Sequence, residues 1–308
     1  MKMLFDIVKL GRPRTWIFII LAFIMGWVTS GESFSTIIII YGIIIYILWI
    51  ASTNIINAYT DVDEDKINLP HRAELVERIG SKGVLYASLF LYAITILLSY
   101  LLMPFLFFII YLVAVFDSFF YSMPPLRFKA NPYASLIAFS GAIFFPFVGA
   151  WSLSGNLSNL WSIAFFLTYW FLTYGTIKNI PDYTGDKVVG LKTSATIFRE
   201  RRTAIKFSFA FLITPYILLI LLLLFNYLNI KFLSLLIGLP FISLIMYKAL
   251  NLQEFGKLEK IHTWGFFYAV SFLSLFLFLL YPTINSIILI LFLFIVLLSI
   301  NITKFDSR

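Results

Sequence analysis

The sequence has no cysteine among its 308 residues and only two histidines. Without cysteine there are no disulfides, thiolate metal sites or cysteine nucleophiles. The histidines, His71 and His262, are far apart in the chain, so a histidine-based metal site is not expected. Charged residues are also scarce, at 12%, whereas 61% of the residues are apolar. So few polar side chains cannot cover the surface of a water-soluble protein of this size, which indicates a membrane protein.

Apolar runs long enough to cross a bilayer as a helix, about 20 residues each, are the main feature of the sequence. They cover residues 15–30, 36–56, 84–102, 104–122, 133–153, 160–177, 207–225, 232–249, 263–281 and 283–302. Helices are expected because lipid offers the backbone no hydrogen-bond partners. The sequence therefore predicts an all-α, polytopic membrane bundle of about ten transmembrane helices, forming a single domain over residues 1–308.

Basic residues follow the alternation of these helices. If the N-terminus is cytoplasmic, 22 of the 23 Lys and Arg residues fall on the cytoplasmic side, and only Lys231 falls outside. This split obeys the positive-inside rule and predicts a multi-pass protein of the cell membrane with both termini in the cytoplasm. The formal net charge of +8 then reflects topology and attraction to anionic lipid, not nucleic-acid binding. The longer loops share this side, so function is expected there, in a cytoplasmic-side cap.

Acidic residues are grouped in two of these loops. Asp61 and Asp65 follow the second predicted span, and Asp182 and Asp186 follow the sixth. On a helical extension of each span, the i,i+4 spacing places both carboxylates of a pair on one face. Like charges so close repel each other, and a cation relieves the repulsion. Mg²⁺ is the natural candidate because it favours carboxylate oxygens together with substrate phosphates. The simpler alternative is a set of solvated loop charges with no common role.

Basic residues accompany both acidic pairs. Arg72 follows the first pair, Lys178 precedes the second, and Arg127 with Lys129 lies in the short, proline-stiffened loop 121–132. Carboxylates with nearby cations suit a metal-bound polyphosphate, since the metals and the cations bind its oxygens from different sides. For any single Lys or Arg, anchoring at the membrane surface is the simpler interpretation.

Three polar segments carry a specific resemblance: 57-NAYTDVDEDKIN-68, 121-YSMPPLRFK-129 and 178-KNIPDYTGDKVVGLKT-193. The first resembles the Asn-Asp-x-x-Asp-x-x-x-Asp motif of the UbiA superfamily of intramembrane prenyltransferases, which Asn57, Asp61 and Asp65 match. The third resembles the second aspartate motif of that superfamily. The residues that match it are Lys178, Asp182, Gly185, Asp186 and Gly190. The middle segment is similar to the Tyr-Ser-x-x-x-x-Arg-x-Lys element.

The sequence departs from the superfamily at several points. Ala58 and Asn179 stand where the two motifs usually have an aspartate, and Asp63 and Glu64 are expected to compensate. The superfamily typically has nine spans, whereas this chain has ten predicted ones. Residues 1–282 are therefore expected to form the catalytic core, and 283–308 to add a peripheral C-terminal helix.

The resemblance implies a prenyltransferase that moves a polyprenyl group from a prenyl diphosphate to a lipophilic acceptor and releases diphosphate. Mg²⁺ would be the cofactor, and the lipid bilayer would hold both substrates. The implied metal ligands and catalytic groups are Asp61, Asp65, Asp182 and Asp186. The implied substrate-binding residues are Asn57, Arg72, Arg127, Lys129 and Lys178.

A dry pocket for an allylic cation is expected beside these residues, because aromatic rings stabilise a cation without attacking it. Aromatic residues make up 19% of the chain, and Tyr121 and Tyr174 each close a span next to a motif. Asp117 is the only acidic residue well inside a predicted span, where a charge is costly and usually functional. It is predicted to position or activate the acceptor. The alternative is a neutral or hydrogen-bonded structural aspartate.

Other classes of function compete with this interpretation. A secondary transporter fits ten spans, and the separation of the two acidic pairs by four spans hints at the internal duplication common among transporters. Transporters, however, tend to place ionisable groups near the middle of the membrane. A passive scaffold gives no reason for two acidic pairs. Within the superfamily, the segments 11-GRPRTW-16, 122-SMPPLRFKA-130 and 181-PDYTGDKVVGLKT-193 look somewhat like branches that act on aromatic quinone precursors or on carotenoids. An aromatic quinone precursor is the preferred acceptor here. A carotenoid or a glyceryl ether phosphate is the alternative.

Overall fold

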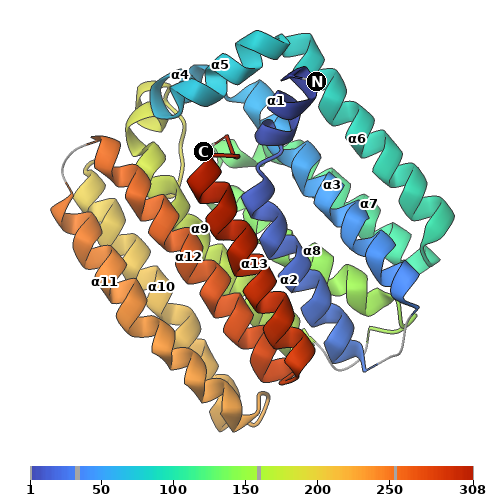
Figure 1. Ribbon diagram of the computed structural model, residues 1–308. Helices are drawn as coiled ribbons and strands as arrows, with labels where there is room; N and C mark the ends of the chain where they lie inside the picture. Colours follow the sequence, from blue (N-terminus) through green and yellow to red (C-terminus); the bar gives the residue numbers. More distant parts are fainter. Residues whose placement is uncertain (1, 32–34, 158–160, 253–254, 308) are drawn as a thin grey trace.

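The computed structural model describes residues 2–31, 35–157, 161–252 and 255–307, and for residues 255–257 it describes the backbone alone. Throughout these ranges the regular structure is helical, and the long helices form one bundle (Figure 1). The all-α prediction is confirmed. Part of the predicted outer loops 31–35 and 154–159, and the first residue of the predicted span 160–177, lie outside the described residues.

Nine helical segments in the described part of the chain are long and apolar enough to cross a membrane. They are α2 (Pro13–Ser30), α3 (Thr36–Thr60), α6 (Ser81–Leu102), α7 (Phe105–Ser122), α8 (Pro132–Ser152), α10 (Arg201–Leu224), Ile230–Asn251, residues Leu258–Leu280 of α12 (Phe255–Leu280), and α13 (Ile284–Thr303). The segment Ile230–Asn251 begins as the 3₁₀ helix η2 (Ile230–Ile237) and continues as α11 (Gly238–Asn251). Each of the nine coincides with one of the ten apolar runs in the sequence.

The remaining predicted span, residues 160–177 and the sixth in chain order, corresponds to α9 (Trp161–Val188), which has 28 residues and is therefore long enough to cross a bilayer. Its C-terminal part carries Lys178, Asp182 and Asp186, which lowers its average apolarity. This helix packs against α8, α10 and α12 in the interior of the bundle. A polar helix of this kind is stable in a membrane when its neighbours shield it from lipid.

The cap at one end of the bundle consists of short helices: α1 (Lys2–Leu10), α4 (Val62–Asn68), α5 (Pro70–Ile79) and the 3₁₀ turn η1 (Phe128–Ala130) (Figure 1). Pro70 begins α5, where a missing backbone N–H costs nothing. Because α4 also contacts α9, the loop after the second span reaches the end of the sixth.

One sequence expectation about this loop is wrong in detail. The helix α3 does not continue smoothly through the first acidic pair but ends at Thr60, and α4 begins at Val62. Asp61 lies at the junction, while the backbone N–H of Asp65 still donates to the carbonyl of Asp61 at 2.7 Å. The second pair does lie within one continuous helix, as expected.

Close packing of α2, α8 and α9 brings the two halves of the bundle together. Gly26 of α2 lies against the backbone of Phe147 on α8, where a Cβ atom would collide. Small residues allow membrane helices to approach in this way. Aromatic rings fill the interior around α9, including Trp170 stacked on Phe272 of α12 at a centroid distance of 4.1 Å. The polar ends of α3 and α9 are thereby held at the same end of the bundle.

Candidate active site

A polar cavity of about 590 Å³ lies under the cap. Its lining includes both acidic pairs, Asp61 and Asp65 from the first motif and Asp182 and Asp186 from the second. Residues separated by more than a hundred positions in the chain therefore meet in one cavity. The geometric condition for a shared site is met, since neither pair faces the opposite end of the bundle.

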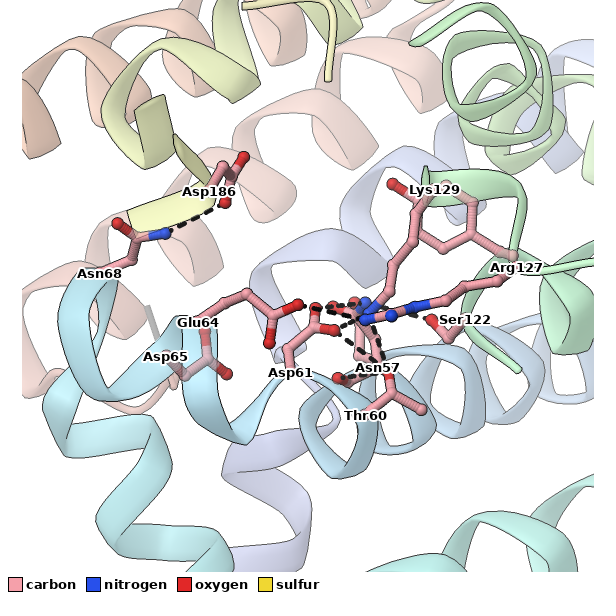
Figure 2. A network of polar contacts seen from close by, with 12 residues as sticks. Asn57, Thr60, Asp61, Glu64, Asp65, Asn68, Ser122, Arg127, Lys129 and Asp186 are labelled. Atoms are coloured by element: carbon pink, nitrogen blue, oxygen red, sulfur yellow. Dashed lines mark hydrogen bonds and ion pairs between the residues drawn. The ribbon is translucent and has the colours of Figure 1, made fainter. Parts of the chain in front are cut away.

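Asp61 is the centre of a polar network in this cavity (Figure 2). Asn57 Nδ2 donates to Asp61 Oδ2 at 2.7 Å and to Ser122 Oγ at 3.1 Å. The ammonium group of Lys129 contacts the carboxylate of Asp61 and donates to Thr60 Oγ1 at 2.9 Å. The first motif and the loop 121–132 are therefore joined through Asp61.

Asp65 is paired with Arg72, and both side chains are almost completely buried. Arg72 Nη1 lies 3.0 Å from Asp65 Oδ2, and Arg72 Nη2 donates to Asn57 Oδ1 at 3.0 Å. Removing one partner of such a buried pair costs about 3–5 kcal/mol because the other charge is left uncompensated. Arg72, predicted as a substrate-binding residue, lines the polar cavity, but its guanidinium is already engaged in holding the first motif together.

Asn68 joins the two aspartate motifs (Figure 2). It is the last residue of α4, and its side-chain amide donates to Asp186 Oδ1 at 3.2 Å while accepting from the backbone N–H of Gly185 at 3.0 Å. The absent side chain of Gly185 makes room for this contact, because a Cβ atom there would collide with the Asn68 amide. In the sequence, Asn68 is the last residue of the first motif segment, and nothing there indicates this role.

Two lysines border the carboxylates. Burial, together with the positive charge of Lys178, lowers the pKa of Lys129 to about 7, and the negative charge of Asp186 opposes this change. The ammonium of Lys178 lies 4.9 Å from the ring centroid of Phe139 and 5.7 Å from that of Tyr121, a cation–π arrangement. An anion placed between these lysines would favour their protonated forms.

Arg127 does not line the polar cavity itself but contacts a residue that does. Its guanidinium pairs with Glu64 at 3.1 Å, and Glu64 lines the polar cavity. Asp63, by contrast, is 84% exposed and pairs only with the surface residue Lys66 among the described contacts. Of the two acidic residues expected to compensate for Ala58 and Asn179, Glu64 therefore faces the cavity, whereas Asp63 faces outward.

The two departures from the aspartate motifs have separate structural explanations. Ala58 is completely buried in an apolar cluster with Leu10 and Leu75, where a carboxylate would be costly. Asn179 lines the polar cavity, and its amide donates to Ser194 Oγ at 2.9 Å, which ties the segment after α9 to that helix.

An apolar cavity of about 840 Å³ adjoins the polar one. Arg12, Asn57, Tyr121 and Lys178 belong to the linings of both, so the cavities share a wall. The remaining lining is largely aromatic and aliphatic, and the rings are Phe18, Trp49, Phe139, Phe171, Tyr174 and Phe266.

The predicted pocket residues Asp117, Tyr121 and Tyr174 all lie on the apolar cavity. Asp117 Oδ2 occupies the space that a Cβ atom on Gly141 of α8 would need. His262, for which no role was predicted, is buried in the same lining.

The polar cavity offers a chemically suitable set of ligands for a hard divalent cation. Four aspartates, Glu64 and the Asn57 amide provide oxygen atoms, the donors that Mg²⁺ prefers. Within the described ranges, however, no three such side chains already converge as a closed cage. Mg²⁺ commonly uses one or two carboxylates and completes its shell with water and substrate phosphates, so an open arrangement suits it.

Comparisons with known proteins agree with this geometry. The chain is 25% identical over 211 residues to a lycopene elongase/hydratase of Haloferax volcanii, covering 63% of this chain and 65% of that protein. It is 28% identical over 275 residues to a digeranylgeranylglyceryl phosphate synthase of Pyrococcus horikoshii, covering 86% of this chain and 95% of the other. The chain therefore spans slightly under two thirds of the first relative and nearly all of the second.

The fold is similar to that of a UbiA homologue from Archaeoglobus fulgidus, solved with DMAPP and Mg²⁺ bound. The TM-score is 0.65 at 21% identity, over 87% of this chain and 99% of the other. The model of the UbiA prenyltransferase family matches residues 16–269, which include both aspartate motifs and most of the bundle. With four-fifths of its length matched in this way, the chain is a multi-pass membrane protein that belongs to the UbiA prenyltransferase family.

Proposed function

We propose that this protein transfers a polyprenyl group from a prenyl diphosphate to a lipophilic acceptor and releases diphosphate. The observation that carries this proposal is the meeting of Asp61, Asp65, Asp182 and Asp186 in one polar cavity that adjoins an aromatic one. A prenyl diphosphate has the same two-part character, with an anionic head and an apolar chain. The head would occupy the polar cavity, and the chain would extend into the apolar cavity.

Formal charges of the cavity lining support a metal-bound diphosphate. Five carboxylates face four basic side chains there, which leaves one net negative charge. A diphosphate ester adds about three more at neutral pH, since its terminal phosphate carries nearly two and the inner phosphate one. One divalent cation at each aspartate pair brings the total to zero. The donor is therefore expected to bind only together with its metal ions.

Asp61 and Asp65 would hold one Mg²⁺, assisted by Asn57, and Asp182 with Asp186 would hold the second. When bound, the ions would stabilise negative charge on the leaving diphosphate. The protein's own cations act in the same direction. Lys129 and Lys178 would neutralise the leaving group, and Arg127 would hold Glu64 in place from behind.

The reaction begins when the bond between C1 of the prenyl chain and the diphosphate oxygen breaks, with both electrons leaving on the oxygen. The allylic cation then lies against the rings of Tyr121 and Tyr174, which stabilise it without attacking it. A nucleophilic atom of the acceptor forms the new bond to C1, and Asp117 positions the acceptor or takes its proton. Exclusion of water by the aromatic lining prevents hydrolysis to a prenyl alcohol.

The two cavities identify the acceptor less directly than they identify the prenyl diphosphate donor. An aromatic quinone precursor fits the ring-lined chamber and could present a hydroxyl group to Asp117. The similarity to a digeranylgeranylglyceryl phosphate synthase over most of both chains favours a glyceryl ether phosphate as the second candidate. A carotenoid, suggested by the shorter similarity to a lycopene elongase/hydratase, is the third. A secondary transporter is disfavoured by membership of a prenyltransferase family.

The distribution of basic residues supports an orientation with the cap in the cytoplasm. Of the 23 Lys and Arg residues, 22 belong to segments at the cap end in the predicted alternation. By the positive-inside rule, both termini are then cytoplasmic and the protein lies in the cell membrane. The donor and the acceptor would both reach the cavities from the bilayer.

The test measures diphosphate release by the purified protein with Mg²⁺, geranylgeranyl diphosphate and, in parallel, each of the three acceptor classes. Mass spectrometry of lipids from an expressing host would identify the product, with the Asp182→Ala variant as the matched control. Asp61→Ala and Asp182→Ala should abolish turnover while leaving the protein folded. Full activity in both variants would refute the proposed reaction.

A further inference from the structure

The chain continues beyond the last helix into a short buried tail. After α13, Lys304 adopts a left-handed conformation with φ of 51°, which turns the chain back toward the bundle. Asp306 and Ser307 are then buried, with 8% and 0% of their surfaces exposed. Figure 1 shows the end of the chain at the cap end, close to the N-terminal helices. This tail lies outside residues 16–269, the part of the chain that matches the family.

The tail is held by residues 5–14 near the N-terminus, through ion pairs, a hydrogen bond and a contact between aromatic rings. Asp306 Oδ1 lies 3.5 Å from Arg14 Nε and 3.9 Å from Arg12 Nε, and Asp306 Oδ2 accepts from the backbone N–H of Arg14 at 3.2 Å. The ring of Phe305 contacts that of Phe5 at a centroid distance of 5.3 Å. All of these charged groups are buried, so their interactions are stronger than those of surface pairs.

Arg12 is the link between this tail and the candidate active site. Its side chain is buried and belongs to the linings of both cavities, at the wall they share. Its backbone has φ of 52°, in the left-handed region that a residue with a side chain seldom adopts. Such a conformation is unfavourable and persists only where neighbouring contacts stabilise it. Asp306 supplies one of these contacts.

We propose that Asp306 is a positioning residue for Arg12, and that the C-terminal tail thereby helps to build the donor site. This inference rests on the proposed function, in which the diphosphate occupies the polar cavity. One carboxylate placed between Arg12 and Arg14 leaves a net positive charge, so it orients Arg12 without cancelling its attraction for an anion. The last helix is then part of the working enzyme and not a peripheral addition.

The first test follows the position of the tail and does not require activity. Because the chain has no cysteine, Ser307→Cys provides a single thiol at a completely buried position with little change in size. Maleimide should label this thiol slowly in the otherwise unchanged protein and roughly tenfold faster when Asp306→Asn is added. Equal labelling rates would show that Asp306 does not hold the tail and would overturn the proposal.

The second test measures the donor site. Calorimetry measures the affinity for inorganic diphosphate in the presence of Mg²⁺. This affinity should be roughly tenfold lower in Asp306→Asn, which is the lower end of the loss caused by removing a residue that supports a ligand-binding side chain. The KM for geranylgeranyl diphosphate should rise by a similar factor, with kcat nearly unchanged. Asp306→Glu should restore both values, and removal of residues 304–308 should reproduce the Asp306→Asn defect.

Asp6→Asn is the matched control. Asp6 is another buried acidic residue of the cap, and its carboxylate pairs with Arg78 at 3.3 Å. Among the described interactions, Asp6 contacts neither Arg12 nor either cavity. The diphosphate affinity of Asp6→Asn should equal that of the wild type. Wild-type affinity in Asp306→Asn, or equal losses in Asp6→Asn and Asp306→Asn, would overturn the inference. A wild-type protein that binds Mg²⁺ and diphosphate but transfers no prenyl group would count against the proposed function alone.

Discussion

Asn68 provides the sharpest test of how the two motifs act together. Replacing it by alanine removes a hydrogen bond to the Asp186 carboxylate and one from the backbone N–H of Gly185. A bond to a charged group contributes about 1.5–3 kcal/mol and a neutral one about 0.5–1.5 kcal/mol. The two bonds together contribute about 2–4.5 kcal/mol. If the whole of this energy serves to join α4 to α9, kcat/KM should fall roughly 30- to 1,600-fold, at about 1.4 kcal/mol per factor of ten. Because Asn68 is only half-buried, water replaces part of the loss, and the lower end is expected.

The assay is diphosphate release at increasing concentrations of Mg²⁺ and donor. A metal-bound diphosphate would itself bridge the two motifs, so the Asn68→Ala defect should appear mainly as a weaker apparent affinity for Mg²⁺ and donor, with kcat partly recovered at saturation. Asn301→Ala is the control, because it removes a side-chain amide bond to the carbonyl of Leu297 within a single helix, at 2.8 Å. Its kcat/KM should remain within about twofold of the wild type.

Gly185→Ala extends the same test to the other partner. The added methyl group would collide with the Asn68 amide, so this variant alone should resemble Asn68→Ala. In the double variant the collision is absent, and activity should be no lower than in Asn68→Ala alone, since the two changes break one contact. Additive losses, or an Asn68→Ala protein with wild-type dependence on Mg²⁺, would refute the idea that this contact joins the motifs.

Three further outcomes are expected. Arg72→Met should lower the free energy of unfolding by about 3–5 kcal/mol, measured by thermal or denaturant unfolding in detergent, because Asp65 is left as an uncompensated buried charge. Lys129→Gln should raise the KM for the donor roughly tenfold, since the ammonium of Lys129 faces both Asp61 and the incoming diphosphate. If Asp117 removes a proton from the acceptor, Asp117→Asn should leave the donor KM unchanged and reduce kcat by at least about 100-fold. An unchanged kcat would limit Asp117 to a structural role.

The sequence was sufficient to predict the two acidic pairs and their common cavity because helix direction alternates. Residues that follow even-numbered spans lie at one end of a bundle, so Asp61 and Asp182 had to share that end. Spacing of four residues then indicated a common face within each pair. The alternation of helix direction does not depend on the distances between helices. The continuous helix expected for each pair was found for Asp182 and Asp186 on α9, whereas α3 ends at Thr60, just before Asp61.

Contacts between segments that are distant in the chain could not be predicted from the sequence alone. Asn68 is an ordinary polar residue by type, and only the approach of α4 to α9 reveals that it binds Gly185 and Asp186. Similarly, the predicted ligand Arg72 could not be distinguished from a structural partner of Asp65 without knowing that both are buried. Asp306 follows a long apolar helix, and its contact with Arg12 spans nearly the whole chain.

The wall between the two cavities of this protein suits the proposed reaction, which requires both of them. Ionisation of an allylic diphosphate demands concentrated positive charge at the oxygen that leaves and an environment without nucleophiles at the carbon that remains. A single polar cavity would admit water to the cation, and a single apolar cavity could not bind the diphosphate. Arg12, Asn57, Tyr121 and Lys178 lie where the two cavities meet, so the bond that breaks should cross this wall. In the proposed reaction, the ammonium of Lys178 would face the leaving oxygen, and the ring of Tyr121, 5.7 Å from that ammonium, would face the cation. Two neighbouring side chains would then match the separation of charge in the transition state.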